Sequence, residues 1–62
     1  MIEYEDFLTL ASEIESQGFD RETALHFAEL LGDTPTIAEN GDVIVMENGR
    51  EVARLKPLNF FA

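Results

Sequence analysis

Residues 37–55 read IAENGDVIVMENGREVARL, and this stretch decides the fold. It holds two Asn-Gly pairs, at 40–41 and 48–49, each placed between residues typical of strands. A two-residue type I′ hairpin needs both central residues at positive φ, which Asn and Gly tolerate best. The sequence therefore predicts two such turns and three antiparallel strands, over residues 36–39, 42–47 and 50–55.

The two predicted turns fix a register for the three strands. Ile37 is then opposite Ile44, and Val45 is opposite Val52. Because side chains alternate between the faces of a strand, this register sorts the residues into two sets. We expect the first set to pack on the rest of the chain and the second to point away from it. The first is Ile37, Ile44, Met46, Ala53 and Leu55, and the second is Ala38, Val43, Val45, Val52 and Arg54.

The residues before this stretch predict two helices, over residues 4–17 and 20–31. Apolar residues recur there at three- and four-residue spacing, as on one face of an amphipathic helix. Asp20 fits the N-cap of the second helix, and Gly18 and Gly32 fit helix ends. The predicted fold is α+β, an N-terminal helical hairpin packed on a C-terminal three-stranded antiparallel β-meander, in one small domain over residues 1–62.

Length and composition exclude several classes of protein. The 62 residues contain no cysteine, which excludes a disulfide scaffold and a thiolate zinc site. The apolar runs are far shorter than the roughly 20 residues that cross a bilayer. The N-terminus, rich in acids, is unlike a signal peptide. We expect a cytoplasmic protein that does not insert into a membrane.

Negative charge is concentrated in the predicted helices. The chain has 13 acidic and 4 basic residues, for a net charge of -9. Residues 1–33 have nine acids and one arginine (net -8), and residues 34–62 have four acids and three bases (net -1). Direct binding to nucleic acid is disfavoured, because it requires a stripe of Lys and Arg. A basic protein partner is compatible with this charge, and so is a purely solubilising role.

No catalytic, cofactor-binding or metal-binding residues are predicted. His26 is the only histidine. Glu22 and Glu29 lie at i−4 and i+3 from it, and such side-chain pairs along a helix explain the histidine without a catalytic role. The sequence assembles no nucleophile, base and orienting group, and it has no phosphate-binding glycine loop and no EF-hand spacing. We expect a protein that is not an enzyme and that has no cofactor.

Residues 17–25, QGFDRETAL, resemble the loop between the first two helices of ubiquitin-associated domains, which often reads Met-Gly-Phe. The resemblance implies that Gly18 and Phe19 contact ubiquitin. Gln17 stands here in place of the methionine, and the predicted strands stand in place of the family's third helix.

The functional expectation is a small, acidic, non-catalytic protein-interaction module, self-associating as a homodimer or binding a basic protein partner. An alternative is an inhibitor that mimics nucleic acid and blocks a DNA- or RNA-binding protein. The tail, residues 56–62, contains two adjacent phenylalanines, and we expect these large apolar side chains to be buried from solvent. Either the tail folds back over the second strand face, or that face meets a partner with the tail at its rim. The predicted protein-binding residues are Val43, Val45, Val52, Phe60 and Phe61.

Overall fold

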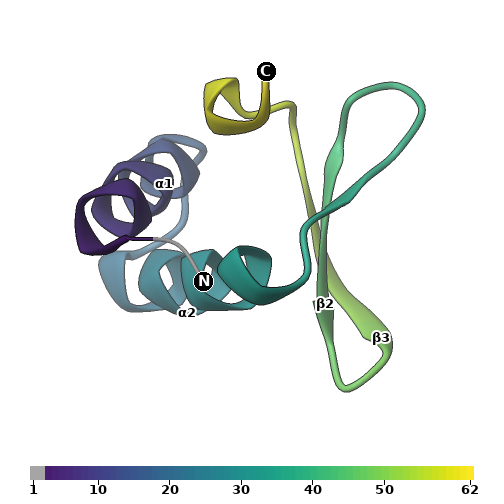
Figure 1. The fold of residues 1–62 in the computed structure, drawn as a ribbon, viewed down its shortest axis with the longest axis horizontal. Coiled ribbons are helices and arrows are strands. Elements are labelled where there is room, and N and C mark those ends of the chain that lie inside the picture. The colour runs from purple at the N-terminus through teal and green to yellow at the C-terminus, as the bar shows by residue number, and fades with distance from the viewer. Residues whose placement is uncertain (1–2) are drawn as a thin grey trace.

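A computed structural model describes residues 3–62 and confirms the α+β fold class, with a helical hairpin followed by a three-stranded antiparallel sheet of order β1-β2-β3. Both helices lie on one side of the sheet (Figure 1). Helix α2 packs on strand β2, and α1 packs on α2 and on a short C-terminal 3₁₀ helix, η1. The elements are α1 (Tyr4–Ser16), α2 (Arg21–Asp33), β1 (Thr36–Ile37), β2 (Val43–Glu47), β3 (Arg50–Leu55) and η1 (Asn59–Phe61).

The connection between the helices follows the sequence prediction. Gly18 has a φ of 107°, in the left-handed region that ends helices. Asp20 is the N-cap of α2, and its carboxylate accepts a hydrogen bond from the backbone N–H of Thr23 at 2.9 Å. This bond satisfies one of the free donors of the first turn. The two caps set the corner at which the hairpin of helices turns.

Helix α2 runs past the glycine that was predicted to end it. It continues through Gly32 to Asp33, and Thr34 leaves the helix with φ −137° and ψ 79°. Pro35 follows, and a proline disfavours the helical conformation of the residue before it. The proline therefore ends α2, and Gly32 stays helical.

The second turn has the predicted type I′ geometry. Asn48 has a φ of 54° and Gly49 a φ of 77°. Glu47 pairs with Arg50 and Met46 with Glu51, as predicted. A bulge then shifts the register, because the next pair is Val45 with Ala53. Val52 is thus the extra residue of β3.

The first turn differs from the prediction. The N–H of Gly41 donates to the carbonyl of Ala38 (2.9 Å), and the N–H of Ala38 donates to the carbonyl of Asp42 (2.8 Å). The loop therefore has three residues, 39–41, with Gly41 at positive φ (93°). This is the three-residue hairpin in which glycine forms the bulge. Ile37 pairs with Val43 in place of Ile44, and β1 is only two residues long.

These two changes reverse the predicted faces of β2, whereas the faces of β3 are as predicted, with Leu55 buried and Val52 exposed. Val43 and Val45 are 0% exposed and face the helices, whereas Ile44 and Met46 are partly exposed. The bulge is the physical reason, because one extra residue moves Ala53 and Leu55 to the face of Val45 and Val43. The buried core is Leu10, Ala11, Ile14, Ala24, Ala28, Leu31, Val43, Val45, Leu55 and Leu58.

The tail folds back against α1 (Figure 1). Leu58 is 5% exposed and belongs to the core, and Phe60 and Phe61 pack against it. Their rings meet edge to face with centroids 5.2 Å apart. The apolar side chains of the tail are thus covered within the chain, but by α1 and the core and not by folding over an outward strand face of Val43, Val45 and Val52 as the first alternative had it. Over residues 3–62, no helix has the length and apolar character needed to cross a membrane.

Candidate functional site

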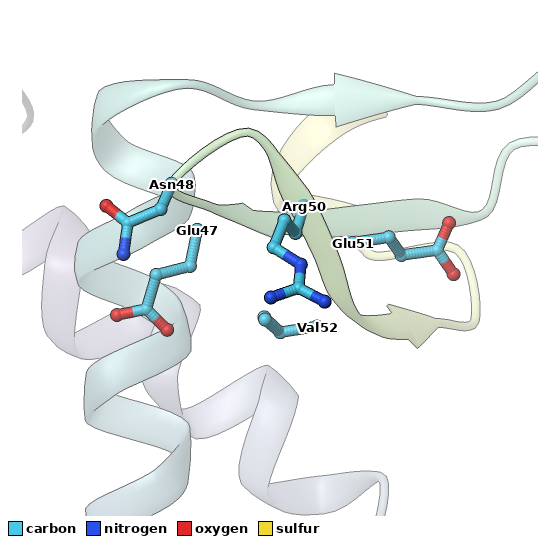
Figure 2. A pocket seen from close by; sticks show the side chains of 5 residues that line it. All are labelled: Glu47, Asn48, Arg50, Glu51 and Val52. Atoms are coloured by element: carbon cyan, nitrogen blue, oxygen red, sulfur yellow. The ribbon is translucent and has the colours of Figure 1, made fainter.

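The five residues predicted to bind a protein do not form one surface. Val43 and Val45 are buried in the core, and the phenylalanines of η1 pack on that core. Val52 is 48% exposed and lies near the β2–β3 turn, at the opposite end of the sheet from η1 (Figures 1 and 2). The prediction that Val43 and Val45 point away from the helices is therefore wrong, and the accessible residue of the set is Val52.

Two polar side chains hold the tail in place, those of Glu13 in α1 and of Gln17, the C-cap residue of that helix. The carboxylate of Glu13 accepts hydrogen bonds from the backbone N–H groups of Asn59 (2.7 Å) and Phe60 (2.8 Å). The side-chain amide of Gln17 accepts from the N–H of Lys56 (3.0 Å) and donates to its carbonyl (3.1 Å). Sequence reasoning missed both anchors, because nothing near Glu13 or Gln17 in the chain points to partners about forty residues later.

The outer surface of the helices carries the negative charge. Within residues 3–33, the only ion pair in the structure joins Arg21 to Glu15 at 3.4 Å. The remaining carboxylates there, apart from Glu13 and the cap Asp20, are exposed and have no basic partner among the described residues. We call these residues the helical acidic surface: Glu3, Glu5, Asp6, Glu22, Glu29 and Asp33.

The sheet, in contrast, pairs much of its charge internally. Arg54 contacts both Asp42 (3.6 Å) and Glu51 (3.9 Å). Glu47 lies 3.4 Å from His26 of α2. Arg54 thus offsets charge within the sheet half, which has four acids and three bases, so that most of the net charge of the domain lies on the helices.

The Asp20 cap has an electrostatic consequence. The hydrogen bonds from Thr23 favour the ionised carboxylate and lower the pKa of Asp20 below its usual value. A group whose folded pKa is depressed stabilises the fold above its unfolded pKa, and that contribution is lost as the pH falls through the folded pKa. The cap is therefore in place at neutral pH.

A shallow hollow lies at the tip of the β2–β3 hairpin and is lined by Glu47, Asn48, Arg50, Glu51 and Val52 (Figure 2). In this view Arg50 and Val52 lie between Glu47 and Glu51, and Asn48 lies at the turn. The hollow is open and mixes charged with apolar side chains, so that it lacks the enclosed apolar walls of a small-molecule site.

The groups considered for chemistry lie on the surface. The His26 side chain is 51% exposed, and its contact with Glu47 is an exposed pair. In the described part of the chain, no three His, Cys, Asp or Glu side chains are grouped so as to hold a metal ion. Phe19, which the ubiquitin-associated resemblance would make a binding residue, is half-buried and packs edge to face on Phe27, with ring centroids 5.5 Å apart.

Two surface features thus stand out, namely the exposed carboxylates of the helical half and the small mixed hollow at the hairpin tip. No protein-family model, no curated protein and no solved structure matches this chain.

Proposed function

We propose that this chain is a small, acidic, non-catalytic protein-interaction module that binds a basic protein through the helical acidic surface. The observation that carries the proposal is the helical acidic surface, whose exposed carboxylates have no basic partner within residues 3–62. Self-association has less support, because Val43 and Val45 are used in the core and the tail is docked on α1.

Helix α2 provides the most regular part of this surface. Glu22, Glu29 and Asp33 follow each other at seven- and four-residue spacing, which places them on one face of the helix. The opposite face buries Ala24, Ala28 and Leu31 in the core. The carboxylates are therefore presented on a rigid element, with an electrostatic field that would speed the encounter with a positively charged partner.

The experiment compares two variants of equal net charge. Glu22→Gln with Glu29→Gln removes two carboxylates from the helical acidic surface. Glu39→Gln with Glu51→Gln removes two from the sheet half. The immobilised parent and both variants are used to recover proteins from lysate at low and high salt, and the isolated protein is then titrated by calorimetry against each bait. We expect a basic protein that binds the parent and the sheet variant and that binds the helix variant at least several-fold more weakly.

Three outcomes would contradict the proposal. Equal weakening in both variants would indicate that net charge alone attracts the protein. Binding that persists at high salt would indicate an apolar interface, since exposed charge pairs are screened. A captured DNA- or RNA-binding protein that duplex nucleic acid displaces from the bait would instead support the mimic of nucleic acid, in which the same carboxylates take the place of phosphates.

A further inference from the structure

The two Asn-Gly pairs of the chain are in very different environments. At the first pair, the side-chain oxygen of Asn40 accepts from the Asp42 N–H at 3.1 Å, and the side-chain nitrogen donates to the Asp42 carboxylate at 3.1 Å. The N–H of Gly41 donates to the carbonyl of Ala38 at 2.9 Å. Both the side-chain amide and the following backbone nitrogen are therefore held by hydrogen bonds.

The second pair is held by none of these contacts. Asn48 is exposed at the hairpin tip, and its side chain extends away from the strands (Figure 2). Within residues 3–62, neither its amide nor the backbone N–H of Gly49 has a hydrogen-bond partner. A Cβ built on Gly49 would meet no atom within 4 Å, so that the space around this turn is open.

We propose that Asn48 is a site of spontaneous deamidation and isoaspartate formation, and that the fold protects Asn40 from the same reaction. The Gly49 backbone nitrogen loses its proton to base and attacks Cγ of Asn48. The new N–Cγ bond forms as the Cγ–Nδ2 bond breaks, and Nδ2 takes up a proton and leaves as ammonia. Water then opens the resulting succinimide at either carbonyl, which leaves aspartate or isoaspartate without any change in oxidation state.

The expected difference in reaction rate between Asn48 and Asn40 follows from the hydrogen bonds that must break before the succinimide ring can close. Ring closure requires the turn to rotate out of its folded geometry, and glycine as the second residue leaves the attacking nitrogen uncrowded in both pairs. At Asn48 the two reacting groups are already free. At Asn40 three hydrogen bonds hold them, and each bond reduces the reactive population several-fold.

The product would change the hairpin tip. Isoaspartate adds one methylene to the backbone of a two-residue turn whose φ values of 54° and 77° set the pairing of Glu47 with Arg50. The new carboxylate also adds negative charge beside Glu47. Deamidation at Asn48 would therefore reshape the hairpin-tip hollow, whereas the helical acidic surface would be unaffected.

The test uses the full folded chain in mildly alkaline buffer. A glutamate-specific protease cuts after Glu39, Glu47 and Glu51, which places Asn40 in the peptide 40–47 and Asn48 in the peptide 48–51. Mass spectrometry follows the conversion of amide to acid in each peptide, and an isoaspartate methyltransferase assay detects isoaspartate. We expect Asn48 to react at least about tenfold faster than Asn40, because the effects of the three hydrogen bonds multiply. The same incubation in denaturant should bring the two rates together, because the sequence Asn-Gly is common to both.

A variant separates protection by hydrogen bonds from other causes. Asp42→Ala removes the carboxylate partner of the Asn40 amide, and circular dichroism verifies that the variant is folded. Asn40 should then react several-fold faster, with the rate at Asn48 unchanged. Equal rates at the two sites in the folded parent, or a ratio that denaturant leaves unchanged, would overturn the proposal.

Discussion

Gly49 has a backbone conformation that residues with a Cβ atom adopt only with strain. Its φ is 77°, and a Cβ at this position would meet no atom within 4 Å. The cost of a substitution therefore comes from the backbone alone. Gly49→Val should lower the free energy of unfolding by about 1–2 kcal/mol, because an L-residue in the left-handed region is strained and a β-branched one more so. Denaturant unfolding of the variant measures the loss.

Gly49→Asn is the matched control, since asparagine tolerates the left-handed region better than other residues with a Cβ. It should retain most of the stability. If the valine and asparagine variants unfold at the same denaturant concentration, the positive φ at residue 49 does not limit the fold.

For single residues, the sequence predicts which ones cap helices and form turns, but it predicts the geometry of those turns only in part. The Asp20 cap, the Gly18 end and the turn at Asn48 are as predicted. The same dipeptide at Asn40 forms a different turn, because its side chain bonds Asp42 and leaves only Gly41 at positive φ. Such a choice depends on neighbouring contacts that a two-residue pattern does not contain.

The docking of η1 on α1 depends on one carboxylate. Glu13 is half-buried and accepts two backbone N–H groups, at 2.7 and 2.8 Å. Hydrogen bonds to a charged group are stronger than neutral ones. Glu13→Ala should lower the free energy of unfolding by about 1–3 kcal/mol, because it leaves these donors without their partner. Thermal and denaturant unfolding measure the change.

Glu15→Ala is the control on the same helix, with the same loss of charge. Glu15 contacts Arg21 at 3.4 Å in an exposed pair, and such pairs contribute only about 0.2–1 kcal/mol. Equal losses in the Glu13 and Glu15 variants would show that charge or helix propensity, and not the anchoring of η1, determines the effect.

The helices and strands were easier to predict from the sequence than the contacts between them. Apolar spacing and caps place both helices to within two residues of their observed ends. The predicted faces of β2 are reversed, because the extra residue Val52 places Ala53 and Leu55 opposite Val45 and Val43. A bulge of this kind has no signature among residues 50–55, and the anchors Glu13 and Gln17 have none in α1. The candidate site was therefore predictable as an acidic helical half and not as a strand face.

The whole molecule carries a net charge of -9 with most of it on one layer. Self-repulsion among the exposed carboxylates of α1 and α2 opposes folding, and salt screens it. We expect a higher melting temperature in about 0.5 M sodium chloride than in about 10 mM. Sodium chloride is the suitable salt, because sulfate strengthens apolar burial by itself. A melting temperature that falls with salt would mean that the ion pairs at Glu15 and Arg54 outweigh the repulsion.

The hydrogen bonds from α1 to the tail also decide when the domain can finish folding. The hydrogen-bond partner of Glu13 is a backbone N–H 46 residues later in the chain, and that of Gln17 is a peptide group 39 residues later. Contacts of such sequence separation are made only after a large loop has closed, which slows folding. During synthesis the helical hairpin emerges before the strands and residues 56–61, so that its apolar face stays uncovered until these segments follow. The interval between these two events is the period in which the nascent chain is most exposed to aggregation.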